Sequence, residues 1–137
     1  MFTPPVILDT NIFVAAGFSA RSASRRITDA IGDGRVILVW NQATRAETQR
    51  VLAKIPPLPD GIFDGLFRQQ GRYEAPTFPQ HFEAVPDPTD RKFAALSAAT
   101  GVVVVSNDSD LLDHWKEVGI AVVRPSNYVR RVGLSAR

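Results

Sequence analysis

Four carboxylates in this sequence stand where an expected strand ends or an expected helix begins: Asp9, Glu47, Asp90 and Asp108. Asp9 directly follows the apolar run of residues 6–8, which reads as a short buried strand. In open α/β sheets, ligands bind in the crevice at the carboxyl ends of the strands. A carboxylate against a buried strand loses solvation unless it is paired, used as a cap or bound to a cation. We therefore expect the chain to bring these four acids together around a divalent metal ion.

Oxygen ligands of this kind suit Mg²⁺, which takes one or two carboxylates directly and keeps several waters. Asn11 and Ser106 lie next to the acids in the sequence and add neutral oxygens suited to orienting carboxylates or water. A metal held in this way activates a water for in-line attack on a phosphodiester and offsets the charge that develops on the phosphate. The four acids divide into two direct ligands, Asp9 and Asp108, and two holders of metal-bound water or of a second ion, Glu47 and Asp90.

Asp9 is the hardest of these acids to explain without a metal, but each of the others has an explanation that needs none. Asp87 stands before Pro88 as a helix N-cap, and Asp90 would then be at the third helical position, where an acid favours the positive helix end. Glu47, taken singly, could be a solvated side chain paired with a nearby arginine. Asp108 and Asp110 follow a strand, where aspartates commonly cap the next helix. Whether Asp87 and Asp110 are structural or functional stays open at this point.

Composition limits the classes of site and of protein. With 137 residues, of which 45% are hydrophobic and 22% charged, the chain is the size of one globular domain. It has no cysteine and only two histidines, His81 and His114, so thiolate and imidazole zinc sites are disfavoured. No apolar run approaches the ~20 residues that cross a membrane, and the first residues lack the basic start of a signal peptide. We expect a cytoplasmic protein.

The net charge of +2 understates how basic the surface would be if the four acids converge in one pocket. The positive charge comes mostly from arginine, including Arg21, Arg25, Arg26, Arg45, Arg50, Arg68, Arg72, Arg91, Arg130 and Arg131. A positive rim around an acidic, metal-binding pocket suits a polyanion such as RNA. An ordinary solvated surface is the alternative, and charge alone does not choose between the two.

The pattern of the chain predicts an α/β fold with a parallel sheet covered by helices. Apolar runs typical of buried strands occupy residues 6–8, 36–40, 102–105 and 120–123. Helical spacing is seen in residues 10–18, 25–31, 42–55, 60–70, 88–100, 111–116 and 125–132, with a loop over 71–86 that has an extended piece near 83–85. If the first and third strands are neighbours, Asp9 and Asp108 flank the point where the strand order reverses.

Four motifs in this order resemble the PIN-domain ribonucleases: LDTN from Leu8, AETQRVL around Glu47, DPTDRKFAALSAA from Asp87, and VVVVSNDSDLL from Val102. The resemblance covers nearly the whole chain. It implies a three-layer α/β/α sandwich with a central parallel sheet, one nuclease domain over residues 1–137, and RNA cleavage that depends on Mg²⁺ or Mn²⁺. It places the family's acidic quartet on Asp9, Glu47, Asp90 and Asp108, its polar positions on Asn11 and Ser106, and a fifth acid on Asp110.

The sequence departs from the family pattern in three places without losing a quartet member. Asn107 and Ser109 stand where glycine and a basic residue are frequent, and Arg91 replaces an acid often seen after Asp90.

The motifs look most like the VapC-like toxin subunits of toxin–antitoxin pairs. On this resemblance we expect an RNA substrate and a cognate antitoxin protein. A homodimer is also expected, with Phe63, Phe67 and Phe78 as exposed apolar residues. One alternative is a weak or inactive PIN-like module that binds RNA or protein. A phosphatase of the haloacid-dehalogenase type is disfavoured, because it needs an acid two residues after the first aspartate, where Asn11 stands.

Overall fold

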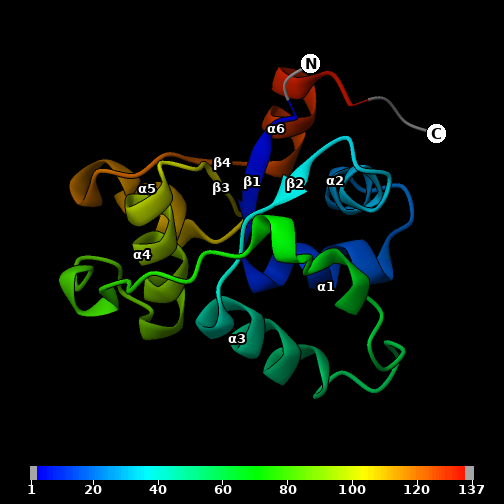
Figure 1. Ribbon diagram of the computed structural model, residues 1–137, viewed down its shortest axis with the longest axis horizontal. Coiled ribbons are helices and arrows are strands. Elements are labelled where there is room, and N and C mark those ends of the chain that lie inside the picture. Colours follow the sequence, from blue (N-terminus) through cyan, green and yellow to red (C-terminus); the bar gives the residue numbers. More distant parts are fainter. Residues whose placement is uncertain (1–2, 135–137) are drawn as a thin grey trace.

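A parallel sheet of four short strands forms the centre of the molecule in the computed structural model, which describes residues 3–134. The strands are β1 (Pro5–Leu8), β2 (Ile37–Leu38), β3 (Val104–Val105) and β4 (Val122–Val123), in the order β2-β1-β3-β4 (Figure 1). The first and third strands are therefore neighbours, which is the arrangement that was expected to place Asp9 and Asp108 on either side of the reversal in strand order. The topological switch point lies between β1 and β3.

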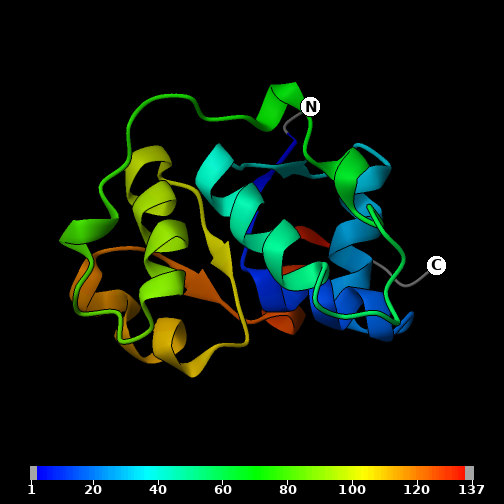
Figure 2. The same ribbon diagram turned by 90° about the horizontal axis from the view of Figure 1, so that it is seen from below.

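Helices cover both faces of the sheet, so the predicted α/β/α class is confirmed. They are α1 (Thr10–Phe18), α2 (Ala23–Gly32), α3 (Gln42–Leu52), α4 (Arg91–Thr100), α5 (Ser109–Val118) and α6 (Pro125–Val132). Helices α4 and α5 lie on one side of the sheet, and α1 and α2 on the other (Figure 1). Helix α3 contacts both α1 and α4 and lies between them in the view from below (Figure 2). No helix within residues 3–134 is long and apolar enough to cross a membrane.

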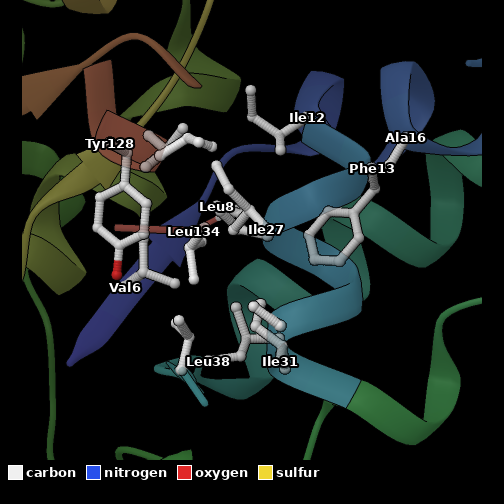
Figure 3. Close-up of a cluster of buried hydrophobic side chains, with 14 of the residues drawn as sticks. Val6, Leu8, Ile12, Phe13, Ala16, Ile27, Ile31, Leu38, Tyr128 and Leu134 are labelled. Carbon is white, nitrogen blue, oxygen red and sulfur yellow. The ribbon is translucent and has the colours of Figure 1, made fainter. Parts of the chain in front are cut away.

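Alternation along β1 divides the core between the two faces. Val6 and Leu8 pack with apolar side chains of α1, α2 and α6 (Figure 3), whereas Ile7 packs with those of α4 and α5. Because successive side chains of a strand point to opposite faces, three consecutive apolar residues require cover on both sides. This double burial holds the end of β1, and with it Asp9, in a fixed position.

Hydrogen bonds and backbone conformation define several helix ends. Ser22 caps α2 by accepting the N–H of Arg25, and Asn41 forms a capping box with Thr44 at the start of α3. Gly101 ends α4 with a φ of 74°, a left-handed conformation in which glycine carries no steric penalty.

The helix predicted over residues 60–70 is wrong. The segment forms two single turns of 3-10 helix instead, Asp64–Leu66 and Gln69–Gly71. Gly61, with a φ of 70°, and Gly65 weaken a continuous helix here. Tertiary contacts then fix the irregular path, since the Trp40 indole N–H donates to the carbonyl of Arg68 at 2.8 Å. The extended piece expected near 83–85 is not among the described strands. A single turn of 3-10 helix, Pro79–His81, lies just before these residues.

Two of the three phenylalanines expected to be exposed lie in the core. Phe63 is 8% exposed, and Phe67 is partly buried, with its ring centroid 5.6 Å from that of Phe13. Both line the same side of the sheet as α1. Phe78 is 51% exposed. Of these three phenylalanines, Phe78 alone therefore offers the exposed apolar surface that led us to expect a homodimer.

Candidate functional site

Asp9 and Asp108 each cap the helix that follows one of the two central strands. Asp9 caps α1, and its Oδ1 accepts the N–H of Ile12 at 3.2 Å. Asp108 caps α5, and its Oδ1 accepts the N–H of Asp110 at 2.8 Å. The strands β1 and β3 are parallel neighbours, so both acids stand at the same edge of the sheet. The predicted position of these two residues at the switch point is confirmed.

Ser106 links the two acids. Its hydroxyl donates to the carboxylate of Asp9 and accepts the N–H of Asp108 at 2.8 Å. Ser106 is 0% exposed and Asp9 is 2% exposed, so this hydrogen-bonded connection is closed to solvent. The expected role of Ser106, to orient a carboxylate, agrees with this geometry.

Three carboxylates form a compact group beside this connection. One oxygen each from Asp87, Asp90 and Asp108 lies within 4.8 Å of the others. Asp90 is 7% exposed, and its Oδ2 is buried without a hydrogen-bond partner. Buried polar atoms are nearly always paired, so a buried carboxylate oxygen without a protein donor, on a residue grouped with two other carboxylates, fits a position beside a bound cation.

Asp87 was expected to be mainly a helix cap. It does act as a cap, and it also lies in the group with Asp90 and Asp108. Its Oδ1 accepts the N–H and the hydroxyl of Thr89 at 3.0 and 2.8 Å, respectively. Pro88 begins a 3-10 turn, Pro88–Asp90, rather than the first turn of the helix predicted over 88–100. Side chains three residues apart eclipse one another in a 3-10 helix, so Asp87 and Asp90 point to the same side. The Asp-Pro-x-Asp spacing was the signal that could have shown this.

Burial and neighbouring negative charges raise two pKa values at this edge. The pKa of Asp90 rises from an ordinary value of 3.8 to about 8, first through burial, then through a side-chain hydrogen bond with Asp108, and then through the negative charges of Asp108, Asp87 and Asp9. Burial also raises the pKa of Asp9 to about 6, against the hydrogen bond from Ser106. Protein groups alone therefore leave the carboxylate forms of both acids poorly compensated, and a bound divalent cation would reverse that.

Glu47 has a different environment from the other members of the predicted quartet. It is 6% exposed and forms ion pairs with Lys92 of α4 at 3.1 Å and with Arg50 of α3 at 2.5 Å. Burial acts to raise its pKa, but the two hydrogen bonds and charges outweigh burial and lower it. Neither Glu47 nor Asp9 belongs to the compact group of three carboxylates. Lys92 was not predicted from the sequence as a partner of Glu47.

The two remaining supporting residues have weaker connections to the acids. Asn11 is exposed, and it interacts with Asp9 through its backbone N–H. Asp110 is partly buried in the first turn of α5 and lies outside the group formed by Asp87, Asp90 and Asp108. The geometry gives Asp110 a place beside the site, and its expected role as a fifth acid stays a prediction.

The donor atoms at this edge fit a hard divalent cation. All of the clustered side chains offer carboxylate oxygen, the ligand type that Mg²⁺ and Mn²⁺ take in proteins. The absence of cysteine from the sequence and of histidine from this cluster argues against zinc. Asp87, Asp90 and Asp108 are the residues that would hold the ion, with Asp9 beside them.

Comparison with known proteins gives a family and related solved structures. Residues 5–110 match the PIN domain family. The chain is also similar to the crystal structure of PAE2754 from Pyrobaculum aerophilum, with a TM-score of 0.60 and 15% sequence identity over 98% of each chain. At that identity the likeness concerns the fold. Among curated proteins, none matches the chain.

Proposed function

Because this chain belongs to the PIN domain family, we propose that it is a divalent-metal-dependent nuclease that hydrolyses phosphodiester bonds of RNA. Members of this family are typically metal-dependent nucleases. The single observation that carries the proposal is the group Asp87, Asp90 and Asp108, in which a buried oxygen of Asp90 has no hydrogen-bond partner among residues 3–134. A purely structural cluster of acids would be expected to have basic partners, as Glu47 does.

The reaction assigns a distinct task to each part of the site. When bound, Mg²⁺ or Mn²⁺ supplies neutralisation of the phosphate and activation of a water for in-line attack. Asp87, Asp90 and Asp108 would hold the cation. Ser106 fixes the carboxylate of Asp9 through its hydroxyl, which restricts the rotation of that carboxylate. The protein contributes position and charge, which dominate catalysis of phosphoryl chemistry.

The biological role follows from the motif resemblance rather than from the site. We propose that the chain is the VapC-like toxin component of a toxin–antitoxin pair and that an antitoxin is its protein partner. A homodimer is proposed with it, on the same resemblance. These proposals concern partners, and the nuclease proposal does not depend on them.

Calorimetric titration of Mn²⁺ into metal-stripped protein tests the site. We expect one or two bound ions in the wild type and at least a tenfold loss of affinity in Asp108→Asn. Asp113→Asn, at an exposed position of α5, is the matched control and should bind as the wild type does. A single-stranded RNA should be cleaved with Mn²⁺ and left intact with EDTA. Equal Mn²⁺ binding by wild type and Asp108→Asn, or no binding by either, would contradict the proposal and favour a non-catalytic binding module.

A further inference from the structure

Glu47 binds two cationic side chains from two different helices. Its Oε1 accepts from the Nζ of Lys92, 45 residues away in the sequence, and its Oε2 accepts from Arg50 one turn further along α3. Both carboxylate oxygens are therefore already paired. A metal ion at Glu47 would have to displace at least one of these cations, whereas Asp90 offers an unpaired oxygen.

The three side chains carry a surplus of one positive charge. The carboxylate is 6% exposed, but the side chains of Lys92 and Arg50 are 35% and 50% exposed, so the cations lie between the buried acid and solvent. Lys92 is two residues beyond Asp90 on the chain, in the first turn of α4, so the basic group and the acidic group are neighbours along the chain. A partly exposed positive group with its side chains held in place is suited to the single negative charge of a phosphodiester.

We infer that Glu47 is a positioning residue, which holds Lys92 and Arg50 to bind the RNA backbone beside the metal site, rather than a metal ligand. The inference rests on the proposed function for its substrate, RNA. It differs from the quartet expected from the motifs in taking Glu47 out of the metal-binding set. Asp87 takes the third place in that set, alongside Asp90 and Asp108.

Metal affinity separates the two roles of Glu47. In calorimetry with Mn²⁺, Glu47→Gln should bind within twofold of the wild type, while Asp90→Asn should lose at least tenfold. A tenfold loss in Glu47→Gln would overturn the inference and restore Glu47 as a ligand. Absence of Mn²⁺ binding by the wild type would contradict the proposed function instead, so the two failures are distinguishable.

RNA affinity tests the basic pair independently of cleavage. A fluorescein-labelled, mixed-sequence single-stranded RNA is titrated in EDTA at several salt concentrations and followed by anisotropy. Lys92→Gln should weaken binding about threefold to tenfold and reduce the slope of log affinity against log salt by about one, as expected for the loss of one phosphate contact. Lys92→Arg should keep the slope.

Lys54→Gln is the charge-matched control, because Lys54 is exposed beyond the end of α3. It should change affinity less than Lys92→Gln does. Equal effects of the two substitutions would show only a general loss of charge and would overturn the assignment of Lys92. Should Glu47→Gln fail to fold, Lys92→Gln still tests the inference, since its side chain is partly exposed.

Discussion

The hydroxyl of Ser106 donates to the carboxylate of Asp9 across the two central strands of the sheet. The same hydroxyl oxygen accepts the N–H of Asp108 at 2.8 Å. One buried side chain thus sets the spacing between the residues that follow β1 and β3. This arrangement couples the stability of the sheet edge to the geometry of the metal site, and it makes Ser106 testable on both counts.

Ser106→Ala should lower both stability and metal affinity. The substitution leaves a buried carboxylate and a backbone N–H without their partner, which costs about 1–3 kcal/mol in the free energy of unfolding. It also removes the hydrogen bond that holds the pKa of Asp9 down, so the carboxylate form that binds a cation becomes less favourable. Denaturant unfolding and Mn²⁺ calorimetry measure the two effects. Ser109→Ala, at an exposed position, is the control; equal results for the two variants would contradict a linking role for Ser106.

Much of the site could be predicted because a few strong local signals fix it. Consecutive apolar residues that need cover on both faces predict parallel strands, and parallel strands share one carboxyl edge. Asp9 follows such a run directly and Asp108 follows one after two residues, so their placement depends on strand order alone. The caps at Ser22, Asn41 and Gly101 depend on local conformation as well.

Long-range side-chain contacts could not be predicted in the same way. The pairing of Glu47 with Lys92 joins residues on two helices whose relative rotation no local pattern encodes. The path of residues 60–70 likewise depends on Trp40 and on close packing at Gly71, which outweigh helical spacing in that segment. The grouping of Asp87 with Asp90 was not predicted for a different reason, since the Pro88–Asp90 turn is 3-10 rather than α-helical.

Stability of the metal-free protein should fall as pH rises from about 4 to about 8. Asp90 and Asp9 have pKa values of about 8 and about 6 in the folded state, against an ordinary 3.8. In this window the folded state holds protons that the unfolded state has released. The slope of unfolding free energy against pH is therefore negative for these groups. Below pH 4 both states are protonated, and the penalty disappears.

Melting temperatures in EDTA between pH 4 and 8 measure this dependence. Asp90→Asn should flatten the profile and be more stable than the wild type near pH 8, because it removes the most strongly shifted carboxyl group. Added Mn²⁺ should also flatten it by favouring the charged forms. Asp113→Asn should follow the wild-type profile. If wild type and Asp90→Asn melted in parallel at every pH, the raised pKa of Asp90 would be contradicted.

Gly71→Ala should destabilise the fold strongly although it adds a single carbon. A Cβ at Gly71 would lie 1.8 Å from the backbone oxygen of Leu38 in β2, so the strand or the turn must move. Overpacking of this kind costs about 1–3 kcal/mol, and here the obstructing atom is backbone. Gly65→Ala meets no atom within 4 Å and is the matched control, expected within about 0.5 kcal/mol of the wild type. Urea denaturation compares the two; similar midpoints would contradict the close approach.

Asp87 has two roles that two substitutions can separate. Asp87→Asn keeps a side-chain oxygen that accepts the N–H and hydroxyl of Thr89 but removes the negative charge. Asp87→Ala removes the cap and the charge together. We expect Asn to retain the wild-type melting temperature in EDTA, or to raise it by relieving repulsion with Asp90, and Ala to lower the free energy of unfolding by about 1 kcal/mol.

Mn²⁺ affinity shows whether the carboxylate of Asp87 is a metal ligand or only a cap. If its carboxylate is a ligand, both substitutions weaken Mn²⁺ binding about equally, despite their different effects on stability. If Asp87 only caps the turn, Asn binds Mn²⁺ as the wild type does and Ala loses affinity only in proportion to its altered fold. The proximity of Asp87, Asp90 and Asp108 within 4.8 Å leads us to expect the first result. Wild-type Mn²⁺ affinity in Asp87→Asn would reduce the metal-binding group to Asp90 and Asp108, with Asp9 beside them.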